Sequence, residues 1–380
     1  MTSPRFIQVH TLTSFSAALL NRDDSGLAKR LPFGDAVRTR VSSQCLKRHW
    51  RTAEDAEWSL AAIGPEMAVR SRKAPEERIL PALIAANVGS DEIRKAVIDE
   101  IAIGLYSKSA AKDPSSRQAL LLGEPELLYL TQRAKQAASE ATPKAAAAAI
   151  QAFWKDEKAN LSAMLKARGT LHAGLEAALF GRMVTSDPDA NTDAAIHVAH
   201  AFTVHAEQSE TDYFTVVDDL ETGTGAGGVF DTEINAGLFY SYVVVDVPAL
   251  VANLGSDRAL AAKAVQHLVH LIATVSPGAK KGSTAPYAYA ELILAESGSR
   301  QPRSLANAFR AAVKPTTAAA TAALKTQLER LDTMYGPSGS RRLAALDPAT
   351  LLPGAGSPVS LALLAEAVAA EIKADPAKAA

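Results

Sequence analysis

The sequence lacks cysteine apart from Cys45, so no internal disulfide can form. It also lacks an uninterrupted apolar run of about 18 residues, the length at which a transmembrane helix becomes a candidate. The first residues, Met-Thr-Ser-Pro-Arg-Phe, contain no long apolar segment of the signal-peptide kind. Together these absences predict a cytoplasmic protein with no membrane partner.

Recognisable catalytic motifs are missing as well: the sequence has no G-x-S-x-G, H-E-x-x-H or C-x-x-C. Residues 223–228 satisfy G-x-G-x-x-G, but they lead into an expected strand, whereas a dinucleotide fingerprint opens a helix. The histidines come as an alternating trio and as a helical pair without a carboxylate or cysteine at matching spacing (His197, His200, His205; His267, His270). We therefore predict no catalytic residue, no metal site and no cofactor.

What the chain does have is a globular composition with an uneven charge. Its 380 residues are 48% apolar and 21% charged, enough for two or three domains or for one domain with large insertions. The net charge is −1, but residues 1–51 alone carry nine Lys and Arg against three Asp, giving +6 and leaving −7 for the remainder. This distribution indicates a localised anion-binding surface on a nearly neutral protein.

The basic residues concentrate in residues 37–51, which we call the basic cradle. Val37 to Val41 alternates as a strand, with Arg38 and Arg40 on one face. A short helix follows, and Ser42 or Ser43 can cap it, so that its free N–H groups and positive dipole end face an anion. The helix carries cations three and four residues apart (Lys47, Arg48, Arg51). With no acid or nucleophile inside it, the cradle predicts a polyanion that is held and left unreacted.

Periodicity predicts an α+β fold. Strands are expected at 5–12, 37–41, 196–204, 238–247 and 288–294, with helices at 43–51, 257–275, 303–334 and 361–372 and an irregular segment at 13–36. Residues 52–180 read as a helical insertion rich in Ala, Leu, Glu and Lys. Without the insertion, the order strand–helix–strand–strand–helix–strand is that of a ferredoxin-like or RNA-recognition-type domain.

Two loops could extend the anion surface. Residues 207–229 form a polar excursion too long for a tight turn, so it should project, with Tyr213, Phe214 and Thr215 at its centre. Aromatic side chains there either fold back onto a core or stack on bases, which contributes ~1–3 kcal/mol per base. The segment 277–284, with Lys280, is either a second backbone-contacting loop or an ordinary helix exit.

Five motifs, in the same order along most of the chain, resemble one known family. They are Asn21-Arg-Asp-Asp24, Ser42-Ser-Gln-Cys-Leu-Lys-Arg48, Gly181-Arg-Met-Val-Thr-Ser186, Phe214-Thr-Val-Val-Asp-Asp-Leu220 and Pro277-Gly-Ala-Lys280. The sequence is similar there to the Cascade backbone subunit of type I-E CRISPR systems (CasC, in the Cas-seven superfamily). The tail and much of the helical insertion match only loosely.

The resemblance implies a hand-like protein with an RNA-recognition-type palm, helical fingers and a β-hairpin thumb. Several copies would stack along a CRISPR RNA, and each thumb would press out one base at regular intervals and leave the rest free to pair with target DNA. The implied partners are CRISPR RNA, the target DNA strand, further copies of this chain, and the large, small, guide-end-capping and guide-processing Cascade subunits. Sequence would be read by base pairing alone, so no catalytic site is required.

The resemblance also assigns residues. Those implied to hold guide phosphates are Arg22, Lys29, Arg40, Ser42, Gln44, Lys47, Arg48 and Arg51. Met183, Phe214 and Thr215 would wedge and cover the displaced nucleotide, while Lys155 and Lys158 resemble lysines that touch target DNA. A further family lysine falls on Leu161, and a cradle position that is usually serine is Cys45. From the residue pattern we add Arg38, Ser43 and Lys280 to the expected RNA-binding surface.

The same resemblance divides the chain into six parts. The expected ranges are 1–52 (palm), 53–181 (fingers), 182–205 (palm strand), 206–229 (thumb), 230–313 (palm) and 314–380 (C-terminal helices and Ala/Pro-rich tail).

Two other functions stay open at this point. One is a metal-dependent ribonuclease with the same palm, using Asp212, Asp218 or Asp219. The other is a subunit that only bridges proteins, its basic face meeting acidic neighbours.

Overall fold

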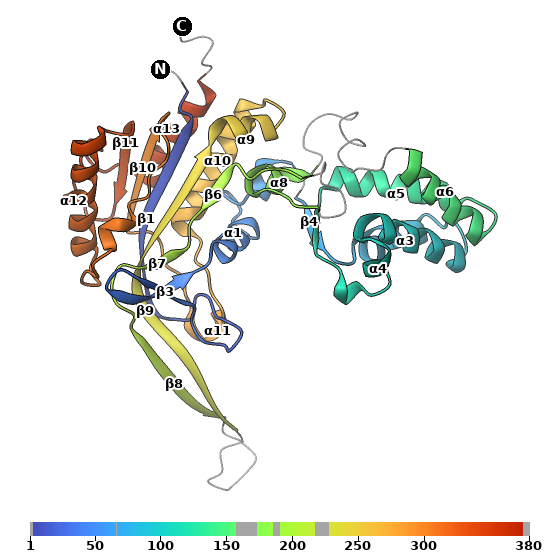
Figure 1. Ribbon diagram of the computed structural model, residues 1–380, viewed down its shortest axis with the longest axis horizontal. Helices are drawn as coiled ribbons and strands as arrows, with labels where there is room; N and C mark the ends of the chain where they lie inside the picture. Colours follow the sequence, from blue (N-terminus) through green and yellow to red (C-terminus); the bar gives the residue numbers. More distant parts are fainter. Residues whose placement is uncertain (1–2, 66, 157–172, 185–190, 217–227, 375–380) are drawn as a thin grey trace. The chain divides into compact units, whose positions relative to one another are not determined.

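The computed structural model describes residues 3–65, 67–156, 173–184, 191–216 and 228–374 (Figure 1). The chain divides into two compact units. The sheet unit comprises residues 1–63, 197–247 and 259–380, and the helical unit comprises residues 64–196 and 248–258. The finer six-part division stays a prediction. Among the described residues, no helix is long and apolar enough to cross a membrane.

A nine-stranded sheet organises the sheet unit. Its main path runs β11-β10-β1-β9-β7-β3-β2, and each pairing along this path is antiparallel. β6 and β8 also pair with β9. The strands are β1 (Phe6–Ala18), β2 (Arg30–Phe33), β3 (Ala36–Val41), β6 (Ile196–Val198), β7 (Ala201–Thr203), β8 (Ser209–Val216), β9 (Gly228–Asp246), β10 (Leu292–Gly298) and β11 (Ser340–Ala345).

The helices of this unit complete a β-α-β-β-α-β core. In chain order the core elements are β1, α1 (Ser43–Arg51), β7, β9, α10 (Arg258–Thr274) and β10. The remaining helical segments of the unit are η1 (Ala61–Ile63), α11 (Lys281–Thr284), η5 (Ala306–Phe309), α12 (Thr317–Tyr335) and α13 (Leu361–Lys373). The predicted ferredoxin-like, RNA-recognition-type α+β fold is therefore confirmed.

Both faces of the sheet are covered. On one face, Leu12 and Tyr240 belong to a buried cluster with Phe309 of η5 and Leu324 of α12. On the other, Phe15 and Phe239 pack edge to face, and Leu46, Trp50 and Ile272 from α1 and α10 lie beside them. Period-2 alternation along β1 thus divides its side chains between two cores.

The helical unit has its own core. Buried residues of α3, α5 and α6, such as Ile101, Leu130 and Ile150, form one cluster. The elements of the unit are β4 (Val69–Ser71), η2 (Pro75–Ile79), α2 (Leu80–Ala85), α3 (Asp91–Tyr106), α4 (Lys108–Ala111), η3 (Pro114–Ser116), β5 (Leu120–Leu122), α5 (Glu124–Ala138), α6 (Pro143–Asp156), α8 (Gly174–Phe180) and α9 (Val247–Asn253), the last beginning one residue before the unit does. A helical insertion was predicted for residues 52–180. The described residues of this unit are mainly helical, and β4 and β5 form a two-stranded sheet beside the helices.

The polar excursion of the sequence is a β-hairpin. β8 pairs with the first part of β9 from Ser209 opposite Asn235 to Val216 opposite Gly228. Figure 1 shows this pair extending away from the rest of the sheet. β9 is one strand of 19 residues, and its second part pairs with β1 and β7 inside the sheet.

Several element boundaries differ from the sequence expectations. β1 continues to Ala18 and β2 forms within 30–33, although residues 13–36 were expected to be irregular. The strand expected at 288–294 is β10 at 292–298, and the helix expected at 303–334 is reduced to η5 and α12, separated by a segment with Pro315. β11 was not predicted, whereas α13 was.

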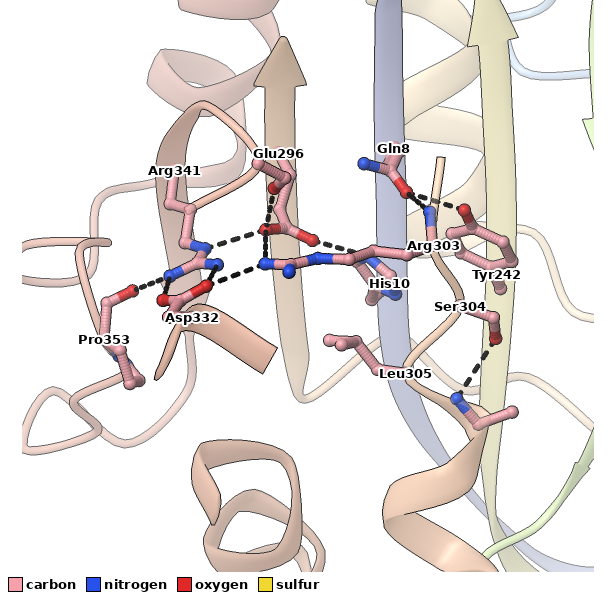
Figure 2. Close-up of polar contacts among 12 residues, drawn as sticks. Gln8, His10, Tyr242, Glu296, Arg303, Ser304, Leu305, Asp332, Arg341 and Pro353 are labelled. Carbon is pink, nitrogen blue, oxygen red and sulfur yellow. Dashed lines mark hydrogen bonds and ion pairs between the residues drawn. The ribbon is translucent and has the colours of Figure 1, made fainter. Parts of the chain in front are cut away.

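A buried polar network lies on the α12 face of the sheet (Figure 2). Arg341 donates to Glu296 Oε1 at 2.8 Å and to Asp332 Oδ1 at 2.7 Å, and Arg303 donates to the same Asp332 oxygen at 2.7 Å. His10 Nε2 lies 3.3 Å from Glu296 Oε2, within ion-pair distance but not aligned for a hydrogen bond. Burial by itself raises the pKa of Glu296, but His10, Ser338 and Arg341 lower it to about 2. Each charge in this network therefore has a protein partner.

Candidate nucleic-acid interface

The basic cradle folds as the sequence predicts, and Ser42 is the residue that caps its helix. Ser42 is extended, and its Oγ accepts the N–H of Cys45 at 3.2 Å. Ser43 is instead the first residue of α1, with a buried side chain, and Gln44 is exposed. The first turn of α1 contains no acidic residue. Its N-terminal N–H groups and dipole therefore favour a bound anion.

Backbone contacts join two further segments to the cradle. Asn21 Oδ1 accepts the N–H of Ser42 at 2.9 Å, and the Asn21 carbonyl accepts the N–H of Lys29 at 2.9 Å. Ala279 donates its N–H to the carbonyl of Leu19 at 2.9 Å. The segments that carry Arg22, Lys29 and Lys280 are thereby held beside the start of α1.

Positive charge dominates this surface. Burial and the charges of Arg40 and Lys29 lower the pKa of His200, whose Nδ1 lies 2.9 Å from Arg40 Nη1. Burial raises the pKa of Cys45, while Arg48 and Lys29 act in the opposite direction. The backbone N–H of Arg40 donates to the carbonyl of Lys29 at 2.8 Å, so these two cationic residues are neighbours. Lys47 and Arg51 are half-buried on the same helix.

Four of the cations have no carboxylate partner. Throughout the part of the chain that the structure describes, no ion pair involves Arg22, Lys29, Arg40 or Arg48. Neighbouring Arg30, by contrast, is held by Glu207 and Glu233. A cluster of cations that the protein does not itself neutralise is suited to phosphates.

Arg38 differs from the sequence expectation. It shares a strand face with Arg40, but it is fully buried and donates to the carbonyls of Phe309 at 2.9 Å and Thr203 at 3.4 Å. Burial lowers the pKa of Arg38, an effect that Asp35 partly opposes. Its guanidinium ties β3 to η5 and presents no surface, so Arg38 is removed from the candidate interface, as is the buried Ser43 side chain.

The hairpin presents exposed aromatic side chains. Phe214 lies directly opposite Phe230, and their rings stack with centroids 5.6 Å apart. Phe214 and Thr215 are adjacent in the strand, so their side chains lie on opposite faces of the hairpin. Phe230 was not among the predicted residues, although its place in the alternation Gly228, Phe230, Thr232 is a signal that could have identified it.

The remaining predicted contacts belong to the helical unit. Met183 is 62% exposed and follows Arg182, which is buried and donates to both carboxylate oxygens of Glu126 at 2.7 Å. This ion pair anchors the backbone directly before Met183. Lys155 is exposed near the end of α6, whereas Lys158 and Leu161 lie outside the described residues.

Among the described residues, neither the aspartates of the ribonuclease alternative nor the histidines form a metal site. Asp212 is exposed on β8, while Asp218 and Asp219 lie outside the described residues. Among the residues that are described, no three His, Cys, Asp or Glu side chains gather as metal ligands would. His270 stacks on Trp58 with centroids 3.6 Å apart, and His267 Nδ1 lies 3.0 Å from the Ser59 carbonyl.

Comparison with known proteins places this geometry in context. The sequence matches the CT1975-like protein family over residues 7–365. A chain of a structure titled "CRISPR RNA-guided surveillance complex, pre-nicking" is 27% identical and superposes with a TM-score of 0.78, covering 96% of this chain and 100% of that one. A chain of a second "CRISPR RNA-guided surveillance complex" is 23% identical with a TM-score of 0.60, over 96% and 98% of the two chains, and shares the fold. No curated protein matches.

Proposed function

Because this chain belongs to the CT1975-like protein family, we propose that it is a non-catalytic, RNA-binding backbone subunit of a CRISPR RNA-guided surveillance complex. The observation that carries the proposal is the set of described cations without carboxylate partners on α1 and on the segments beside it. The likeness to a chain of such a complex over nearly the whole length supports it. The ligand would be a polyanion bound through its phosphates, as a guide RNA is when sequence is read by base pairing.

Finer features belong to the same proposal. The complex would be of the type I-E Cascade kind and act in the cytoplasm. Copies of the chain would line the guide together with the large, small, guide-end-capping and guide-processing subunits. Phe214, Thr215 and Met183 would displace one guide base per copy, and Lys155 and Lys158 would touch the paired target DNA strand.

Purification from cells that contain the CRISPR locus tests the proposal. We expect discrete short RNA to copurify, protected at even intervals after nuclease treatment. Nucleic-acid-free protein in the presence of all partner subunits would contradict it. Incubating the same preparation with Mg²⁺ tests the ribonuclease alternative, since cleavage that Asp212→Asn abolishes would favour that alternative. Loss of assembly after ribonuclease treatment would argue against a subunit that only bridges proteins.

A matched pair of double variants tests the cradle itself. Arg22→Ala with Arg48→Ala removes one exposed cation of the cradle and one of the segment joined to it, while Lys325→Ala with Arg330→Ala removes two exposed cations of α12. Each phosphate contact with single-stranded nucleic acid contributes ~0.7 to the slope of log affinity against log salt. We expect the cradle double variant to flatten this slope by roughly 1.4 and the α12 double variant to leave it unchanged. Equal slopes would remove the cradle from the interface.

A further inference from the structure

We propose that Phe230 and Lys280 complete, with Phe214, a nucleotide-binding face on the β8–β9 hairpin, where one unpaired base stacks against the aromatic pair and Lys280 contacts the adjoining phosphate. The inference rests on the proposed function, because it requires single-stranded RNA at this surface. It assigns the stacking to one face of the hairpin and to two rings.

The two phenylalanines form a continuous apolar surface. They are directly paired across the strands, with ring centroids 5.6 Å apart and ring planes 23° apart. Rings in this offset-stacked arrangement are in contact. A base that stacks on the outer face of one ring extends this stack, so the two rings act as one binding element. The Phe214 and Phe230 side chains are 43% and 49% exposed, so much of this binding element faces solvent.

Gly228 holds the Phe230 ring in place. A Cβ atom added at Gly228 would lie only 2.8 Å from Phe230 Cε2, which means that the ring extends over this glycine. An aromatic ring that covers a strand glycine is a recognised way to stabilise a β-ribbon. Phe230 thus lies between Gly228 on its own strand and Phe214 on the other, and it orients Phe214.

Lys280 supplies the charge on the same face. Its Nζ donates to Thr232 Oγ1, two residues beyond Phe230 along β9, and lies 6.0 Å from the Phe214 ring centroid. The neighbouring Ala279 bridges to Leu19 in the segment that leads to the cradle. Lys280 therefore connects the cradle, which binds phosphates, to the rings, on which a base stacks.

The opposite face of the hairpin provides an internal comparison. Tyr213 is 64% exposed on the same strand, but the residue across from it is Asp231. A carboxylate directly across from an aromatic ring repels phosphate, and no described cation lies over the Tyr213 ring. Glu210 and Asp212 lie on the Phe214 face, so both faces carry carboxylates. Among the described residues the Phe214 ring has a lysine over it and the Tyr213 ring has no cation, so we place the nucleotide on the Phe214 face.

Photo-crosslinking tests this placement in the assembled complex. A guide RNA substituted with 5-iodouridine is irradiated at long wavelength, and the crosslinked peptides are identified by mass spectrometry. We expect adducts on Phe214 and on Phe230. Adducts on Tyr213 with none on Phe230 would overturn the proposal.

Matched variants test it independently. Phe230→Leu keeps an apolar side chain over Gly228 but removes the ring, and Tyr213→Leu makes the same kind of change on the other face. Loss of stacking, at ~1–3 kcal/mol per base, corresponds to roughly a 5-fold to 160-fold change in base accessibility. For Phe230→Leu we expect nuclease cutting at the displaced nucleotides to increase by this factor, and for Lys280→Gln we expect a smaller increase. Tyr213→Leu should be cut like the wild type, and Phe230→Tyr should restore wild-type cutting.

The outcomes separate the two proposals. If no RNA copurifies with the wild-type complex, the proposed function fails and this inference fails with it. If RNA copurifies and the Phe214→Leu footprint changes while those of Phe230→Leu and Lys280→Gln do not, only this inference is overturned. An unchanged melting temperature for Phe230→Leu assigns the altered footprint to the binding face and not to misfolding.

Discussion

Two groups of arginines in the sheet unit have the same chemistry and opposite surroundings. Arg303 and Arg341 lie on the α12 face of the sheet, where Glu296 and Asp332 neutralise them. Arg40 and Arg48 lie at the β3–α1 junction, and no described carboxylate pairs with either. In the first group the protein supplies the anion, and in the second the anion must come from elsewhere.

The contrast teaches that the partner of a charged side chain, more than its type, identifies its role. A buried guanidinium without an anion costs several kcal/mol, so Glu296 and Asp332 stabilise the fold as long as Arg303 and Arg341 are present. Exposed cations close together repel one another only weakly in water, so the cradle can remain unneutralised until a ligand binds. Variants of the first group should therefore change stability, and variants of the second should change binding.

The largest effect is expected from Arg341→Met. Removing one partner of a buried ion pair leaves an uncompensated charge and costs about 3–5 kcal/mol. Urea denaturation should show this loss, while Arg330→Met, at an exposed position of the same α12 face, should stay within about 0.5 kcal/mol of wild type. Equal losses in the two variants would contradict the structural role of the network.

Low pH should destabilise the folded protein through the same network. The pKa of Glu296 is about 2 in the folded protein, below its ordinary value of 4.5. A lowered carboxyl pKa stabilises the fold above the ordinary value, and that stabilisation is lost as the pH falls from 4.5 towards 2. The loss should be on the order of 3 kcal/mol and should be absent in Glu296→Gln. Denaturation curves as a function of pH measure both, and a variant with an unchanged acid response would refute this assignment.

One strand contains both kinds of arginine. Arg38→Met should cost about 2 kcal/mol, because it leaves the buried carbonyls of Phe309 and Thr203 without a donor. Arg40→Met should instead leave stability within about 0.5 kcal/mol and reduce the RNA salt slope by ~0.7. Thermal melts and salt titrations on both variants test this, and the reverse pattern would contradict the assignment of Arg38 to stability and Arg40 to binding.

The smallest effect concerns the cap of α1. Ser42→Ala removes the side-chain acceptor for the Cys45 N–H and should cost about 1 kcal/mol. Ser43→Ala is the adjacent control, because Ser43 does not cap the helix, and we expect a smaller loss in the same denaturation assay. A larger loss for Ser43→Ala would mean that the cap has been assigned to the wrong serine.

Local sequence signals were sufficient to predict the strand and helix of the cradle. The alternation at 37–41, the serine turn and the helical spacing of Lys47 and Arg51 are all short-range features, and the structure reproduces them. Arg38 shows that such short-range signals do not predict burial by distant residues. Alternation places it on the same face as Arg40, but its burial depends on Phe309, which is 271 residues away along the chain.

Pairing between distant strands explains the other misses. β11 has the sequence Ser-Arg-Arg-Leu-Ala-Ala, which contains no β-branched or aromatic residue, and it is a strand because β10 pairs with it. The glycines at 223–228 give no strand signal, so the start of β9 at Gly228 was not predicted. Its register with β8 was needed to show that Phe230 lies opposite Phe214.

The length of β9 has a mechanical consequence. One continuous strand leads from the aromatic pair at its beginning to the centre of the sheet, where β1 and β7 flank it. Such a strand resembles a cantilever whose root is held by its neighbours in the sheet. If a base stacks on Phe230 as we propose, its load would pass along this one backbone into the part of β9 that pairs with β1.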